Sequence, residues 1–136
     1  LPGDQPQRDS TLEDDEVITA LCLPAEGFAG GSAYLKVRDR ASYAFALVSV
    51  AAALRLEAGR VVEARIALGG VAHKPWRNRE AEALLIGEKP ERAAYERAAE
   101  RIVAEAVGLE HNAFKVELAR RAVVRALLQA SGGETV

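Results

Sequence analysis

The chain has 136 residues, 49% of them hydrophobic and 28% charged, with a formal net charge of −2 at pH 7. This length fits one domain that can fold without disulfides or metal, and the composition is that of an ordinary soluble globular protein. The small negative charge gives no reason to expect a nucleic acid or an anionic membrane as a partner. Cys22 is the only cysteine, which excludes an internal disulfide and agrees with a cytoplasmic location.

The first 14 residues are expected to be an entry segment without regular structure. Pro2, Gly3 and Pro6 interrupt polar side chains that show no periodicity. The chain also begins with Leu-Pro-Gly and contains no methionine, so we expect it to be a fragment of a longer protein. Residues 15–131 would then form the domain itself.

Alternating side chains predict a first strand over residues 16–23. In a strand, alternate residues lie on opposite sides. Here Val17, Thr19, Leu21 and Leu23 would lie on one side, and Glu16, Ile18, Ala20 and Cys22 on the other. Pro24 would end the strand because it has no N–H for the ladder. We interpret Cys22 as a small core residue of this strand.

Three further strands are expected downstream. Residues 33–37 follow a glycine-rich loop and precede the charged cluster 38–40. Residues 47–56 and 61–68 are apolar runs joined by a short loop in which Gly59 can adopt a positive φ, which is typical of a hairpin. The alanines at 51–53 also suit a helix by propensity. We favour the hairpin, because a helix would leave the second run without an adjacent partner.

The rest of the chain predicts three helices. The first spans residues 79–86, with Asn78 as its N-terminal cap and Gly87 at its end. The second begins at Pro90 and ends at residue 107, and the third follows Asn112 and ends near Gln129. Strands followed by a run of helices indicate an α+β domain, with an antiparallel sheet of about four strands and three helices packed on one face.

No familiar catalytic or metal-binding motif is present. Gly69-Gly70 lacks the GxGxxG pattern of a dinucleotide site, and a turn at a strand end explains it. His73 and His111 lie on separate loops without ligand spacing, so we predict no metal site. Trp76, next to Arg77, has two readings of about equal weight: an exposed interface anchor, or a plug between the sheet and the first helix.

Two long stretches carry a resemblance to a known family. They read GSAYLKVRDRASYAFALVSVAAALRL, from Gly31 to Leu56, and GRVVEARIALGGVAHKPWR, from Gly59 to Arg77. Together they resemble the C-terminal domain of the FAD-binding (medium) subunit of molybdenum hydroxylases, which include xanthine dehydrogenase, aldehyde oxidoreductase and carbon monoxide dehydrogenase. The entry segment resembles the link from the FAD-binding domains that precede this one.

The resemblance implies a role in electron transfer within a multisubunit oxidoreductase. In such enzymes the substrate is hydroxylated at a molybdenum cofactor in one partner subunit. Electrons then pass through 2Fe–2S clusters of another subunit to FAD and on to an external acceptor. The preceding domains would hold most of the FAD, so the fragment alone is expected to be inactive.

The resemblance also implies two cofactor-binding positions and no catalytic residue. From spacing alone, Lys36 is a solvated charge near a strand end. In the family the matching lysine reaches towards the flavin, where an ammonium would stabilise negative charge at the N1–C2=O edge on reduction. Ile18 matches a position that contacts the flavin through its backbone. The alternative is a stand-alone protein-interaction module, in which Lys36 would be dispensable.

Overall fold

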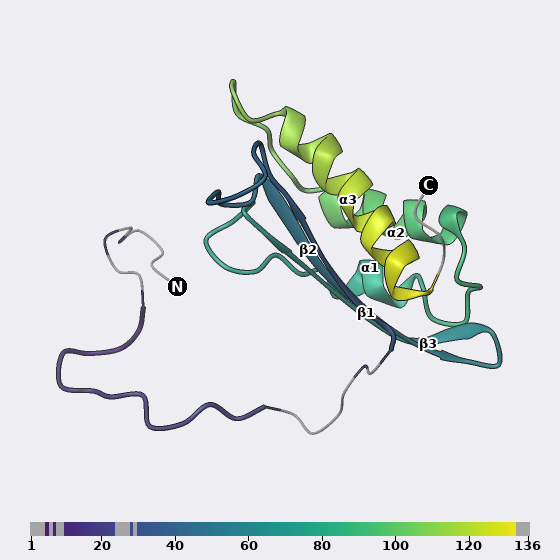
Figure 1. The fold of residues 1–136 in the computed structure, drawn as a ribbon, viewed down its shortest axis with the longest axis horizontal. Coiled ribbons are helices and arrows are strands. Elements are labelled where there is room, and N and C mark those ends of the chain that lie inside the picture. Colours follow the sequence, from purple (N-terminus) through teal and green to yellow (C-terminus); the bar gives the residue numbers. More distant parts are fainter. Residues whose placement is uncertain (1–4, 6, 8–9, 24–27, 29, 133–136) are drawn as a thin grey trace.

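The computed structural model describes residues 5, 7, 10–23, 28 and 30–132. Among these residues, an antiparallel sheet has the order β1 (Ser32–Val37), β2 (Val48–Glu57) and β3 (Arg60–Gly69). The helices α1 (Arg79–Ala83), α2 (Arg92–Val103) and α3 (Phe114–Ala130) lie on one side of this sheet (Figure 1). The predicted α+β class, with helices packed on one face of an antiparallel sheet, is confirmed.

The hairpin between β2 and β3 forms as predicted. Ala58 and Gly59 occupy the tip with φ values of 49° and 74°, and the two strands pair antiparallel over their length. β1 adds to the other side of β2, with Lys36 opposite Ser49 and Ser49 opposite Gly69. The alanines at 51–53 lie in the central strand, so pairing with two neighbours overrides their helix propensity.

One hydrophobic core lies between the sheet and the helices. Alternate residues of β2 and β3 point into it, because side chains of a strand alternate between its two faces. The helices α2 and α3 meet the strands with the buried stripe Tyr95, Ala98 and Ile102 and the stripe Val123 and Leu127. The sheet contributes mainly branched aliphatic side chains: Val48, Val50, Leu54, Val61, Ile66 and Leu68.

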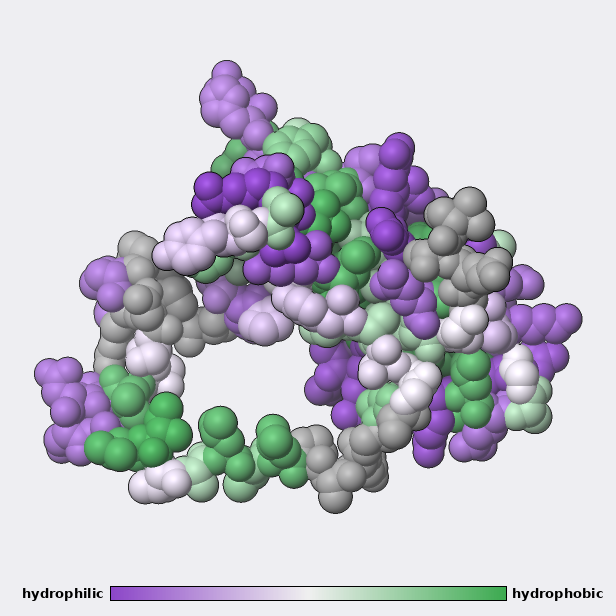
Figure 2. Space-filling model, in the orientation of Figure 1, coloured by the Kyte–Doolittle hydropathy of each residue, from purple (hydrophilic) through white to green (hydrophobic). Residues whose placement is uncertain are grey.

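The strand predicted over residues 16–23 is absent, so the described sheet has three strands rather than about four. This segment runs away from the domain on the side opposite the helices (Figure 1), and its apolar side chains are exposed along it (Figure 2). Val17, Leu21 and Leu23 each expose 80% or more of their surface, and Cys22 is exposed rather than buried. An alternating pattern defines two faces, but a strand also needs a neighbour for its backbone groups.

The predicted Asn78 cap and the turn at Gly87 are confirmed, whereas the predicted lengths of α1 and α2 are too long. The Asn78 side chain accepts a hydrogen bond from the backbone N–H of Ala81 at 3.0 Å, and Gly87 has a φ of 83°. However, α1 ends in turns after Ala83, and α2 spans residues 92–103 instead of 90–107. Among the described residues, none of the helices has both the length and the apolar character to cross a membrane.

Candidate functional site

The face of the sheet that the helices do not cover is the first candidate site, and we call it the open face. Its residues share an outward orientation and are mostly small: Tyr34, Lys36, Ser49, Ala51, Ala53, Arg65, Ala67 and Gly69. A hollow of about 390 Å³ lies on this face, with Ala51, Ala53 and Ala67 among its lining residues together with Tyr34 and Arg65. A broad, flat surface of small side chains suits a planar ligand better than a spherical one.

Lys36, a predicted cofactor-binding residue, lies on this face near the end of β1. Its side chain is exposed, and its ammonium has no ion-pair partner within the part of the chain that the structure describes. It does not line the hollow itself, but it is two residues from Tyr34, which does. Residues two apart in a strand share a face. The structure therefore places an uncompensated positive charge beside the hollow.

Ile18, the second predicted position, lies on the extended segment outside the folded domain. Its side chain is 67% exposed and does not contribute to the hollow. The structure therefore does not bring Ile18 and Lys36 together. A role for Ile18 would need the segment around it to be held by residues other than those described.

An ion pair between the buried Glu82 and the partly exposed Arg77, at the edge of β3, was not predicted from the sequence. The Glu82 carboxylate is 6% exposed, and Arg77 donates to it from Nε at 2.7 Å and from Nη2 at 2.9 Å. The backbone N–H of Ile66 donates to the same carboxylate at 2.8 Å. The hydrogen bonds to Glu82 raise the pKa of Arg77 above its ordinary value, so its charge is permanent. No sequence motif links Arg77 with Glu82. The only sequence signal is the Asn78 cap, which sets the start of α1 and so the position of Glu82 within it.

Arg65 adds a second fixed charge to the same side of the hollow. Its Nε and Nη2 atoms donate to Glu63 at 2.9 and 2.7 Å, and its guanidinium lies 4.8 Å from the centre of the Phe28 ring. Arg77 also lines the hollow, so the floor of small residues has guanidinium groups at one border and Lys36 at another. Glu63 and Glu82 balance the charges of Arg65 and Arg77, so the positive charge of Lys36 is the unpaired one among the described residues named here.

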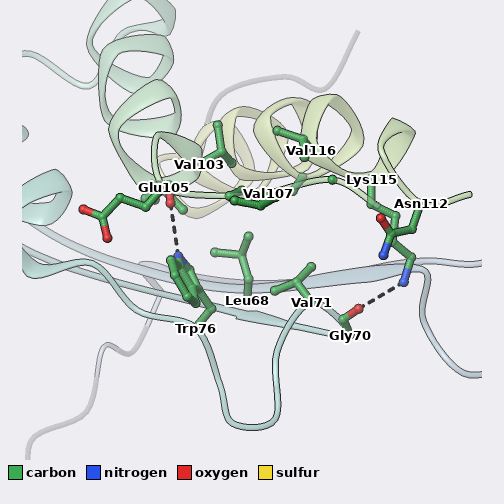
Figure 3. A pocket seen from close by; sticks show the side chains of 14 residues that line it. Leu68, Gly70, Val71, Trp76, Val103, Glu105, Val107, Asn112, Lys115 and Val116 are labelled. Carbon is green, nitrogen blue, oxygen red and sulfur yellow. Dashed lines mark hydrogen bonds between the residues drawn. The ribbon is translucent and has the colours of Figure 1, made fainter. Parts of the chain in front are cut away.

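The loop around Trp76 forms a second, separate pocket of about 260 Å³ between β3, α2 and the start of α3 (Figure 3). The indole Nε1 donates to the carbonyl of Ile102 at 3.1 Å, and the Trp76 backbone pairs with Leu68. Trp76 is thus a junction residue, as one of its two readings predicted, but it joins the sheet to α2 rather than to α1. The Lys115 ammonium donates to the carbonyl of Gly70 at 3.1 Å across the same pocket.

The described residues offer no acid–base or metal chemistry that stands out. They contain no group of three or more His, Cys, Asp or Glu side chains that could hold a metal ion. His73 and His111 are both exposed, on different loops. Burial raises the pKa of the Tyr95 hydroxyl, and its interaction with the Ser131 side chain opposes that shift. It lies within the core rather than at the open face.

Comparison with known proteins gives a consistent result. The family model of the CO dehydrogenase flavoprotein C-terminal domain matches residues 33–130. The aldehyde oxidoreductase FAD-binding subunit PaoB of Escherichia coli (strain K12) is 43% identical over 129 residues. That match covers 95% of this chain and 37% of PaoB. The chain thus spans little more than a third of this curated relative.

Solved structures agree with the sequence comparison. The carbon monoxide dehydrogenase of Hydrogenophaga pseudoflava matches with a TM-score of 0.72 and 32% identity, over 81% of this chain and 39% of that chain. The quinoline 2-oxidoreductase of Pseudomonas putida 86 matches with a TM-score of 0.67 and 29% identity, over 75% of this chain and 37% of that chain. This chain therefore belongs to the CO dehydrogenase flavoprotein C-terminal domain family, as its resemblance predicted.

Proposed function

We propose that this chain is the C-terminal domain of the FAD-binding subunit of a molybdenum hydroxylase, and that its open face borders the flavin. The observation that carries the proposal is the 43% identity, over 95% of the chain, to the FAD-binding subunit of an aldehyde oxidoreductase. By itself the domain would be inactive, because the described residues include no phosphate-binding loop that could hold FAD.

The residues of the open face fit a flavin ring in shape and charge. Ala51, Ala53 and Ala67 leave a flat floor, since none has a side chain longer than a methyl group. Lys36 supplies a positive charge that has no partner among the described residues, and such a charge stabilises negative charge that develops on a nearby ring. Ile18 would contribute through its backbone once the rest of the subunit holds its segment in place.

The chemistry of the bound group defines what this domain must do. FAD would supply the redox step, taking electrons that the molybdenum cofactor and the 2Fe–2S clusters of companion subunits deliver and passing them to an external acceptor. This chain would orient the ring, exclude water from one side of it, and bias its charge through Lys36. It would provide no catalytic acid or base.

The test uses the full-length subunit with flavin bound and replaces Lys36 by methionine, which keeps the length of the side chain but removes its charge. We expect the reduction potential of the flavin to fall by about 30 mV, which for two electrons corresponds to about 1.4 kcal/mol. Lys36→Arg should restore most of the potential. The matched control is Lys89→Met, an exposed lysine in the loop before α2.

An unchanged potential, flavin content and turnover in Lys36→Met would contradict the assigned role of Lys36. Together with a full-length subunit that binds no flavin, that result would favour the alternative of a protein-interaction module.

A further inference from the structure

Ser49 is a polar residue of the open face that is almost completely buried. Only 8% of its surface is exposed, and its hydroxyl has no hydrogen-bond partner among the residues that the structure describes. Glu82, which is buried to a similar degree, accepts three hydrogen bonds. Buried polar groups are paired in nearly all folded proteins, because an unpaired one loses its hydrogen bonds to water without compensation. The Ser49 hydroxyl therefore lacks a partner that a ligand or the rest of the subunit would supply.

The hydroxyl points away from the helices, to the same side as the flat floor. Ser49 lies in β2 opposite Lys36 of β1 and Gly69 of β3, and directly paired residues of neighbouring strands share a face. A Cβ atom added to Gly69 would lie 2.6 Å from Ser49 Oγ, so the hydroxyl extends over this glycine. The helices cover the other face of the sheet (Figure 1). The missing partner of Ser49 must therefore approach across the open face.

Packing of the sheet does not require a hydroxyl at position 49. The next residues of β2 on the same face are Ala51 and Ala53, which line the hollow, and Ser49 continues their row just beyond that lining. This row of the floor thus accepts side chains of one methyl group. An alanine at position 49 would continue the row without an unpaired polar group. The serine is therefore better explained by a ligand than by the fold.

The neighbour Lys36 indicates which chemical group Ser49 would contact. Directly opposite residues have Cβ atoms about 4.5–5.5 Å apart, so the Ser49 hydroxyl and the Lys36 side chain can reach the same edge of one ligand. A hydroxyl and an ammonium are both hydrogen-bond donors, and together they favour an acceptor that carries negative charge. Under the proposed function, the flavin has such an acceptor at its N1–C2=O edge, which gains negative charge on reduction.

We propose that Ser49 is a second flavin contact of this chain, whose hydroxyl donates a hydrogen bond to the C2=O oxygen beside Lys36. The proposal rests on the proposed function, which supplies the flavin. The two side chains differ in effect. The neutral hydroxyl binds the oxidised ring as well as the reduced one, whereas the charge of Lys36 favours the reduced ring. Ser49 therefore acts mainly on the affinity for FAD, and Lys36 mainly on the reduction potential.

The experiment measures FAD binding and the flavin carbonyl in the full-length subunit. Ser49→Ala removes the hydroxyl and should raise the dissociation constant of FAD about fivefold, as expected for one lost neutral hydrogen bond. In infrared difference spectra, the C2=O stretch of isotope-labelled FAD should move to higher frequency, because its oxygen accepts one hydrogen bond fewer. Ser49→Thr keeps a hydroxyl on a residue that suits a strand, and should restore most of both values.

Two controls separate flavin binding from folding. The melting temperature of the flavin-free Ser49→Ala subunit should not fall, since the variant loses no hydrogen bond within the part of the domain that is described. The matched substitution is Ser131→Ala, which removes a half-buried hydroxyl after α3, where it donates to the Leu128 carbonyl at 3.0 Å. It should leave the FAD dissociation constant and the C2=O frequency unchanged.

Two results would overturn the proposal. One is an unchanged dissociation constant and C2=O frequency in Ser49→Ala, and the other is a lower melting temperature of its flavin-free form, which would assign the hydroxyl to the fold. If Lys36→Met lowers the flavin potential while Ser49→Ala changes nothing, the role of Ser49 fails and the proposed function stands. A wild-type subunit that binds no FAD would refute both.

Discussion

In the middle of the central strand β2, the two faces of the sheet differ in the size of their side chains more than in their polarity. Along β2, Val50 and Leu54 point to the helices and are buried, whereas Ala51 and Ala53 point to the open face. All four residues are apolar, so the central strand has no polar side in this stretch. A strand of this kind is normally covered on both faces. The helices cover one face, and the proposed flavin and its domains would cover the other.

The largest expected difference between the faces is in stability. Ile66→Ala removes a side chain that is 1% exposed beneath the helices, and should lower the free energy of unfolding by about 3 kcal/mol. Ala51→Leu, on the open face, should change it by no more than about 0.5 kcal/mol. Urea unfolding of the 136-residue chain, followed by circular dichroism, measures both values. Equal destabilisation would show that the two faces are packed alike and would remove the basis of the comparison.

A smaller loss of stability is expected for substitutions of Glu82, which lies in α1 beside β3. Glu82→Ala should cost about 2 kcal/mol, because it leaves the partly exposed Arg77 without its partner and the N–H of Ile66 without an acceptor. Glu82→Gln should cost about half of that, since its amide oxygen can still accept from Ile66. The same urea titration tests this ranking. If the two variants are equally unstable, the charge of Glu82 matters and its hydrogen bond to the sheet does not.

The smallest effect on stability is expected for Glu117, which lies on the exposed surface of α3 and forms ion pairs within that helix. Arg120 and Arg121 donate to Glu117 and lower its pKa from 4.5 to about 2. A carboxyl group whose pKa is lower in the folded state stabilises the fold above its ordinary pKa and loses that effect as the pH falls. The melting temperature of wild type should therefore exceed that of Glu117→Gln slightly at pH 6, and the difference should vanish between pH 4.5 and 2.

The matched control for this pH series is Glu110→Gln, whose neighbour His111 is 3.9 Å away at a highly exposed position. It should show no such pH-dependent difference. A difference for Glu117→Gln that persists at pH 2 would mean that the ion pairs with Arg120 and Arg121 are not its cause.

Local signals predicted most of the fold. Gly59 marked the hairpin, Asn78 the start of α1, and Gly87 the end of its last turn, because each depends on only a few neighbouring residues. The strand over residues 16–23 failed because its pattern says nothing about where a pairing partner would be. The end of α2 at Val103 instead of residue 107 shows the same limit, since alanine-rich helix ends depend on tertiary contacts.

The candidate site was predictable only in part. Lys36 was singled out through the family resemblance, and alternation alone would place it on the same side as Tyr34. The ion pair between Arg77 and Glu82 could not be found, because it depends on how α1 packs beside Ile66.

The shift in strand register between Arg55 and Leu56 separates the part of the hairpin that tolerates an insertion from the part that does not. An inserted or deleted residue between Val48 and Arg55 would turn the alanines towards the helices and the valines outwards, because side chains alternate along a strand. Beyond Arg55 the register has already shifted by one residue, next to an exposed tip. The Ala58–Gly59 tip is therefore the place where an epitope or fluorescent tag could be inserted without exchanging the two faces.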